Sequence, residues 1–221
     1  MKYITLKGFG RWQLGNQIFQ YLFLDLISKL TKRQIVFFDD KEDKQKKEKI
    51  RINTLFNINL EFIDFDENLK FKDIIEKSFY DKNIINEIIS DDTEVINLIG
   101  FFQSYKYFKH EFNLEFNLEF NLEFNLKNKI NQLFGFDDKI KQEGNMIIEN
   151  IHNINQDKTL NLVSIHVRRG DYIKYDDYHV ILPMIYYINA IRKIEKEYNN
   201  VYYLVCSDDI NWCKRVFYFI K

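Results

Sequence analysis

The chain has 221 residues, enough for one large domain or two small ones. Apolar residues make up 46% of it, including 21 Phe and 14 Tyr, so a sizeable core can form. The 32 basic residues almost balance the 33 acidic ones. This balance excludes the usual composition of a general nucleic-acid binder, which has an excess of clustered Lys and Arg.

The two cysteines, Cys206 and Cys213, form no CxxC pair and have no His partner at zinc spacing. We therefore expect neither a disulfide framework nor a zinc site, and a reducing compartment. The first six residues do not form a signal peptide, and no apolar run is long enough to span a bilayer. The sequence thus predicts a soluble, cytoplasmic protein.

The first part of the chain alternates strand and helix patterns. Lys2–Leu6 and Gln34–Phe38 are predicted strands, and Gln17–Leu30 between them has the apolar spacing of a helix. Glycines between residues 8 and 15 mark the connecting loop. This order is typical of an α/β unit with a parallel sheet. Further along, we expect helices near 72–78 and 81–90.

The middle of the chain contains a strand, a repeat and a linker. Val95–Phe101 is a predicted strand, and an aromatic segment follows it. Residues 111–126 are four copies of Glu-Phe-Asn-Leu, an amphipathic pattern on a strand, which we interpret as a low-complexity insertion without a site. Residues 127–150 are predicted to be mainly helical, with a break near 135–138. The polar stretch 153–159 is the predicted linker, so we expect domains at 1–156 and 157–221.

The second part repeats the strand–loop–helix–strand order. Leu160–Val167 and Val201–Cys206 are predicted strands, and Pro183–Glu197 is a predicted helix with proline near its first turn. Another helix is expected to begin at Ile210. In α/β sheets, ligands bind beyond the carboxyl ends of strands. The residues after both strands are therefore the candidates for a site.

The first of these candidates is the segment His166 to Asp171. Strand alternation places His166 and Arg168 on one side and Arg169 on the other, so the two arginines need not have the same role. An arginine fork suits a phosphate, and Gly170 lets the backbone approach a ligand. A surface Arg–Asp pair beside a buried strand is the equally open alternative.

Three other features carry weaker signals. The glycines up to Gly15 could present backbone N–H groups to an anion at a helix N-terminus, or form a plain tight turn. Asp208 and Asp209 could hold a nucleoside or a metal ion, or cap the next helix. His179 could act as a general base, or be a solvated loop residue.

Taken together, the segments resemble the α-1,2-fucosyltransferases, inverting glycosyltransferases that use GDP-L-fucose. The opening pattern of that family is matched at Gly10-Arg11 and Leu14-Gly15-Asn16-Gln17, with Trp12 and Gln13 as a two-residue interruption. The remaining matches follow in order along the chain: Gly100–Phe108, His166–Tyr172, His179 with Tyr186–Ile191, and Ser207–Lys214.

The resemblance implies an α/β fold of the GT-B kind, with two Rossmann-like domains and an acceptor-side first domain. It implies that GDP-fucose is bound by Gly15, Asn16, Gln17, His166, Arg168, Arg169, Ser207, Asp208 and Asp209. Fucose would pass to a galactose 2-hydroxyl of a glycan with inversion, without a cofactor or metal ion. Arg168 would stabilise the leaving GDP, and Asp171 or His179 would accept the proton.

The sequence departs from the family pattern after Lys214. The family's Asn-Ser-Ser-Phe-Ser-Trp-Trp-Gly segment is not found, and the second domain has two predicted strands where a doubly wound sheet has about five or six. We therefore expect an incomplete, truncated second domain. An inactive remnant with at most nucleotide-sugar or glycan binding, or a subunit completed by a partner chain, is the alternative to a working enzyme.

Overall fold

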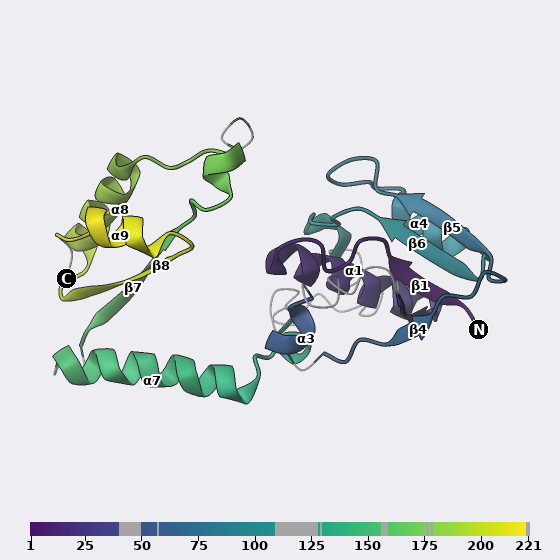
Figure 1. The fold of residues 1–221 in the computed structure, drawn as a ribbon, viewed down its shortest axis with the longest axis horizontal. Helices are drawn as coiled ribbons and strands as arrows, with labels where there is room; N and C mark the ends of the chain where they lie inside the picture. Colours follow the sequence, from purple (N-terminus) through teal and green to yellow (C-terminus); the bar gives the residue numbers. More distant parts are fainter. Residues whose placement is uncertain are drawn as a thin grey trace, which may run out of the picture. The chain divides into compact units, whose positions relative to one another are not determined.

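The computed structural model describes residues 1–39, 50–56, 58–108, 128, 130–155, 159–175, 177 and 179–219. The chain forms two compact units, Met1–Gln142 and Glu143–Lys221 (Figure 1). Each unit combines helices with parallel strands, as predicted for an α/β protein with a Rossmann-like arrangement. None of the helices in the described ranges combines the length and the apolar character needed to cross a membrane.

A parallel sheet of four strands forms the centre of the first unit. Its order is β2-β1-β6-β5, with neighbours that are far apart in the chain. The strands are β1 (Tyr3–Leu6), β2 (Gln34–Ile35), β5 (Phe71–Ile75) and β6 (Val95–Ile99). β3 (Phe37–Asp39) and β4 (Phe62–Asp64) pair in parallel as a second small sheet.

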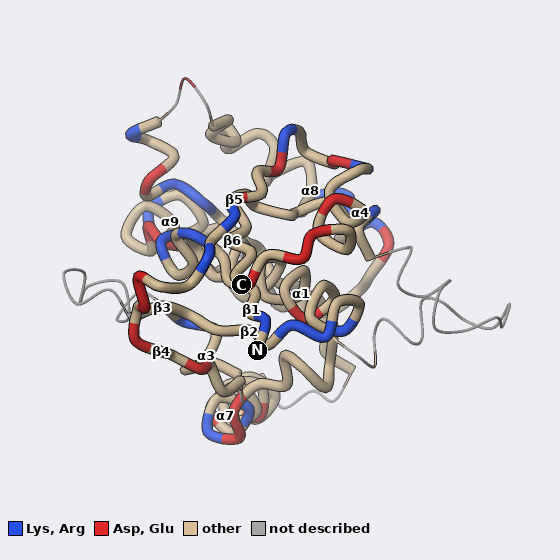
Figure 2. Tube along the Cα trace, turned by 90° about the vertical axis from the view of Figure 1, so that its right-hand side faces the viewer, with Lys and Arg blue, Asp and Glu red and all other residues tan. Residues whose placement is uncertain are grey.

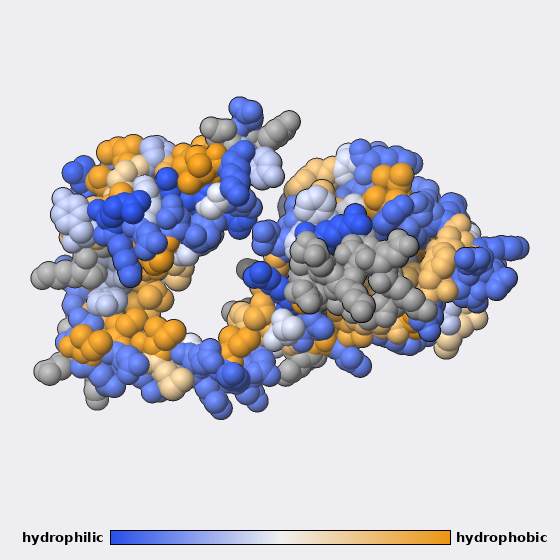
Figure 3. All heavy atoms as spheres, viewed as in Figure 1, coloured by the Kyte–Doolittle hydropathy of each residue, from blue (hydrophilic) through white to orange (hydrophobic). Residues whose placement is uncertain are grey.

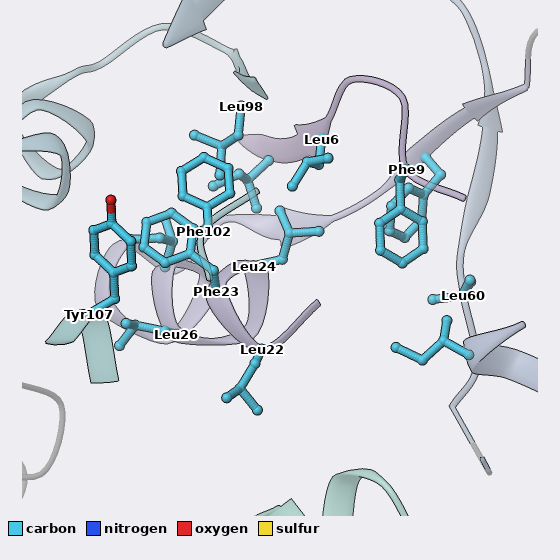
Figure 4. Packing of buried hydrophobic residues seen from close by; sticks show 14 of the residues in the cluster. Leu6, Phe9, Leu22, Phe23, Leu24, Leu26, Leu60, Leu98, Phe102 and Tyr107 are labelled. Carbon is cyan, nitrogen blue, oxygen red and sulfur yellow. The ribbon is translucent and has the colours of Figure 1, made fainter. Parts of the chain in front are cut away.

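Helix α1 (Leu14–Thr31) supplies much of the core of this unit. Its apolar positions bury Phe23, Leu24 and Ile27 completely, and the helix ends at Lys32, which has a left-handed backbone. Phe23 stacks on Phe102 with ring centroids 4.2 Å apart (Figure 4). Short helices of the unit include α3 (Ile52–Leu55) and α4 (Ile84–Ser90).

The structure corrects three of the sequence predictions. Residues 72–78 are not helical, because Phe71–Ile75 pairs along its whole length with β6 as a parallel strand. The predicted strand 34–38 is divided at Val36 between two sheets. The linker predicted at 153–159 begins too early, since α7 (Asp138–Asn155) continues through Asn155. The repeat at 111–126 lies outside the described residues.

The second unit is built around two parallel strands, β7 (Asn161–Val167) and β8 (Val201–Ser207), which pair over their full length. Helix α8 (Met184–Glu197) connects them, and α9 (Ile210–Val216) follows β8. A separate core joins the strands to both helices. It consists of Val167, Tyr187, Ile191, Tyr203, Cys213 and Phe217.

Helix α7 is amphipathic. Figure 2 looks nearly along it and shows its charged residues mostly on one side. Of its apolar residues, Ile151 is buried, whereas Ile147 and Ile154 are exposed. Apolar atoms accordingly lie at the surface along α7 (Figure 3). In the β7–β8 pair, His166 and Cys206 lie on the face away from the core formed with α8 and α9, and both are exposed.

Candidate functional site

The carboxyl ends of β7 and β8 meet at one edge of the second unit. Because the strands are parallel, with Val167 opposite Ser207, the residues that follow each strand come together. These residues are Arg168 to Asp171 on one side and Asp208 with Asp209 on the other. The edge therefore gathers two arginines and three carboxylates.

Arg168 is the cation at the centre of this edge. Its Nε and Nη2 donate to the two carboxylate oxygens of Asp171, at 3.0 and 2.7 Å, in the bidentate geometry that suits a planar guanidinium. Its Nε also lies 3.6 Å from Oδ2 of Asp208. The hydrogen bond to Asp171 raises the pKa of Arg168 and lowers that of Asp171. The Arg168 side chain remains 33% exposed, so a ligand can reach it.

Arg169 has a different environment. Its guanidinium carbon lies 4.1 Å from the ring centroid of Trp212, and its Nε lies 3.3 Å from Oδ2 of Asp209. Both partners belong to the start of α9, and cation–π contacts of this kind hold a guanidinium firmly. Arg169 thus ties the end of β7 to α9. The two arginines thus have different partners, and the expectation that they need not share a role stays a prediction.

Asp208 fixes the backbone turn after β7. Its Oδ1 accepts the backbone N–H of Arg169 at 2.8 Å. Partial burial acts to raise the pKa of Asp208, but the N–H groups of Arg169 and Gly170 and the charge of Arg168 lower it overall. A Cβ on Gly170 would lie 2.9 Å from Oδ2 of Asp208, so the close approach requires glycine.

Asp209 and Ser207 act mainly on the start of α9. Asp209 Oδ1 accepts the backbone N–H of Trp212 at 3.1 Å, which is the predicted N-cap. The backbone N–H of Asp209 donates to Ser207 Oγ at 2.9 Å. Both side chains therefore have local structural partners.

Tyr172 and His179 complete the cluster around Arg168. Their rings stack with centroids 4.1 Å apart and an angle of 7° between the ring planes. The guanidinium carbon of Arg168 lies 5.1 Å from the Tyr172 ring centroid. The structure thus brings together Arg168, Asp171 and His179, the three predicted catalytic residues.

In the first unit, the motif Gly15-Asn16-Gln17 opens α1. Gln17 is fully buried: its Nε2 donates to the carbonyl of Trp12 at 2.8 Å, and its Oε1 accepts the backbone N–H of Arg51 at 2.9 Å. Asn16 accepts a hydrogen bond from Gln103 at 2.5 Å. A Cβ on Gly15 would meet no atom within 4 Å. Gln17 therefore stabilises the unit, whereas Gly15 and Asn16 lie nearer its surface.

A family model, described as glycosyl transferase family 11, matches residues 10–221. The chain belongs to this family. The match begins at Gly10, the first residue of the motif that precedes α1, and includes the whole β7–β8 edge. This confirms the family resemblance found in the sequence.

Two curated relatives of this family 11 chain come from Escherichia coli. An alpha-1,2-colitosyltransferase is 43% identical over 58 residues, which are 25% of this chain and 20% of the relative. The O-antigen biosynthesis glycosyltransferase WbnK is 43% identical over 60 residues, which are 26% of this chain and 20% of the relative. The chain thus matches about a fifth of the length of each relative.

Sequence reasoning missed two residues that shape this family 11 chain. Glu76 holds the segment after β6: its Oε2 accepts the backbone N–H groups of Phe101 and Phe102, and its Oε1 accepts the hydroxyl of Tyr107. Residue 76 lies in the range 72–78, which the sequence wrongly predicts to be a helix, so these contacts of Glu76 were not predicted. Trp212 belongs to the family motif Ser207–Lys214, and its position three residues after the cap Asp209 places it at the start of α9.

No group of three or more His, Cys, Asp or Glu side chains that could hold a metal ion occurs within the described ranges. The prediction of a metal-independent reaction stays a prediction. The guanidinium of Arg168 is paired with Asp171, and its side chain is 33% exposed to solvent.

Proposed function

We propose that the chain is a glycosyltransferase that transfers L-fucose from GDP-fucose to the 2-hydroxyl of a galactose residue in a glycan, with inversion. The observation that carries this proposal is the cluster of Arg168 with Asp171 and Asp208 at the carboxyl edge of β7 and β8, in a chain of family 11. Nucleotides bind at this edge in open α/β sheets.

The diphosphate of the donor would bind at Arg168. The guanidinium is charged at all relevant pH values, and its fork matches two phosphate oxygens. Asp171 holds the fork at the edge in the absence of an anion. As the bond to fucose breaks, negative charge grows on GDP, and a fixed cation stabilises it. This charge is what allows the proposed reaction to proceed without a metal ion or other cofactor.

The nucleoside would lie over the turn between β8 and α9. Asp208 and Ser207 lie at this turn, and so does the guanidinium of Arg169, which packs on the ring of Trp212. His166 would contribute from the exposed face of β7, two residues before Arg168 in the chain. The donor contacts predicted for Gly15, Asn16 and Gln17 rest on the family resemblance alone.

His179 is our choice for the general base. A base works best when its pKa lies near the pH of the reaction. The pairing with Arg168 lowers the pKa of Asp171 below the usual range of a carboxyl, which makes Asp171 a weak proton acceptor at neutral pH. His179 stacks on Tyr172 beside the same cluster, and imidazole suits the role. Asp171 then acts by orienting Arg168.

The experiment combines calorimetry with a transfer assay. Titration of GDP-fucose should give binding, and incubation with a galactoside should give a fucosylated product whose yield EDTA does not change. Arg168→Ala should weaken donor binding at least ~100-fold, because a charge-assisted bidentate contact contributes about 3 kcal/mol. Arg192→Ala, which removes an exposed arginine on α8, is the matched control and should bind normally.

The outcomes separate the alternatives. Absence of donor binding at millimolar concentration would overturn the proposal. Binding without transfer would favour an inactive remnant or a subunit that needs a partner chain. Because one relative is an alpha-1,2-colitosyltransferase, nucleotide-linked colitose is the second donor to test. A product from colitose alone would correct the donor while leaving the site in place.

A further inference from the structure

Two exposed aromatic rings lie against each other on the surface of the first unit. The ring centroids of Trp12 and Phe101 are 4.9 Å apart, and the ring planes are inclined by 58°. Trp12 is 49% exposed and Phe101 is 41% exposed. Large aromatic residues that pair in solvent, outside a core, are informative about binding. Trp12 belongs to the two-residue interruption of the family motif, so the pair is a feature of this chain.

Both rings are held by backbone contacts. The turn before Trp12 passes through Gly8 and Gly10, with φ angles of 76° and 87°, and the Trp12 carbonyl accepts the side-chain N–H of Gln17. On the other side, the backbone N–H of Phe101 donates to Glu76 at 2.9 Å. A surface fixed in this way loses little conformational entropy when it binds a ligand.

Two amide side chains follow the aromatic residues closely in the sequence. Asn16 and Gln103 are hydrogen-bonded to each other, and each amide has a second polar atom of the opposite kind, so that together they offer a donor and an acceptor. Each lies within four residues of one ring. A ligand on the rings would therefore meet polar groups of both kinds at its edge.

Gln20 holds the loop that carries Phe101 from within the unit. It is 1% exposed, and its Nε2 donates to the carbonyl of Gly100, the residue before Phe101. Its Oε1 is buried without a hydrogen-bond partner among the described residues. Buried polar atoms are almost always paired with protein or with ordered water.

We propose that Trp12, Phe101, Asn16 and Gln103 form a binding platform for a hexopyranose of the galactose class. One face of galactose presents several C–H bonds, which pack against the electron-rich face of an aromatic ring. Its hydroxyls stand at the rim, where amides can bind them. A large protein partner would need a wider apolar surface than two rings. The choice of galactose rests on the proposed function; the platform itself rests on the geometry.

Fluorine NMR can test this platform directly. The chain has two tryptophans, Trp12 and Trp212, so protein labelled with 5-fluorotryptophan gives two signals. Trp12→Phe and Trp212→Phe identify them. Titration with methyl β-D-galactopyranoside should shift the Trp12 signal in a saturable manner and leave the Trp212 signal in place. A Trp12 signal that stays fixed up to the solubility limit of the sugar would overturn the proposal.

Kinetics separates a binding role from a structural one. Trp12→Ala should raise KM for the galactoside about tenfold, a loss of roughly 1.4 kcal/mol, while the calorimetric Kd for GDP-fucose stays unchanged. Phe79→Ala is the matched control, because Phe79 is an exposed aromatic residue of the same unit at 74% exposure. An unchanged acceptor KM in Trp12→Ala, with normal thermal melting, would remove the platform from the acceptor site.

The two proposals fail in different ways. If the sugar shifts the Trp12 signal but no transfer is seen with any donor, the platform stands and the enzymatic function fails. If transfer is seen and the Trp12 signal does not respond, the function stands and the platform is wrong. Binding of a protein at Trp12 with no response to sugar would also contradict the platform.

Discussion

At the scale of single residues, the adjacent arginines Arg168 and Arg169 have different partners. Arg168 lies at the open edge with Asp171, whereas Arg169 is bound between Trp212 and Asp209. The first is placed to meet a ligand, and the second connects β7 to α9. Substitution of each should therefore affect a different property.

Arg169→Ala should lower the stability of the second unit by about 1 kcal/mol, since it removes a cation–π contact and a partly exposed ion pair. Arg168→Ala should leave stability nearly unchanged and weaken donor binding instead. Thermal melting and calorimetry of both variants provide the comparison. If Arg168→Ala were the more destabilising change, the two roles would be wrongly assigned.

The pKa of Asp171 gives a prediction about pH. Arg168 lowers the pKa of Asp171 in the folded protein. The contribution of the Arg168–Asp171 pair to the free energy of unfolding is therefore complete above the ordinary carboxyl pKa of 3.8, and it is lost as the pH falls through the lower pKa of the folded state. Between about pH 5 and about pH 8, Asp171 stays ionised. The Asp171→Asn variant should thus show the same shape of pH–rate profile as the original protein in this range. A profile that becomes flat in Asp171→Asn would identify Asp171 as the base.

At the scale of elements, the segment after β6 depends on Glu76. Its carboxylate accepts three hydrogen bonds, from Phe101, Phe102 and Tyr107, and burial raises the pKa of Tyr107 well above its ordinary value. Tyr107 is completely buried and packs on Phe23 (Figure 4). The loop that presents Phe101 is therefore rigid.

Gly100→Ala tests the fit of this segment. A Cβ at position 100 would lie 2.6 Å from Cβ of Glu76, closer than packed carbon atoms approach. We expect the free energy of unfolding to fall by about 1–3 kcal/mol, as for other overpacked positions. Gly15→Ala, at a position where a Cβ meets no atom, is the control and should be neutral or slightly stabilising. Equal stability of the two variants in chemical denaturation would contradict the described packing.

Elements with a strong local pattern were predictable from the sequence. Strand β7, helix α8, strand β8 and the cap at Asp209 all follow from apolar periodicity and from residue types at the ends of elements. Strand β5 was not predictable in this way, because Lys72 and Asp73 interrupt its apolar residues. Its conformation depends on pairing with β6. The non-local contacts of Gln17 with the backbone at Arg51, and of Glu76 with Phe101, leave no local signal either.

At the scale of the whole molecule, the chain has two cores made of separate residues. The first surrounds α1, and the second joins β7 and β8 to α8 and α9. Exposed apolar residues on α7, including Ile147 and Ile154, add to the surface of the second unit. Exposed apolar surfaces of this kind often bind other proteins. The partner chain, which the sequence predicts from the incomplete second domain, stays a prediction.

Separate cores predict separate unfolding transitions. Leu24→Ala removes a fully buried side chain of the first core and should destabilise that unit by about 2–5 kcal/mol. Phe217→Ala should destabilise the second unit by about 3–5 kcal/mol, since its ring packs on Tyr187 and Trp212. Calorimetry should show each variant shifting a different transition. One transition shifted alike by both would mean that the cores unfold together.

The central claim is that a nucleotide binds where β7 and β8 end. The most direct measurement is titration of ¹⁵N-labelled protein with GDP, followed by the backbone amide signals. The account predicts that the largest changes occur at Arg168–Asp171 and Ser207–Asp209, and that Arg168→Ala abolishes them while Arg192→Ala does not. Changes confined to other residues, or no change at millimolar GDP, would contradict it.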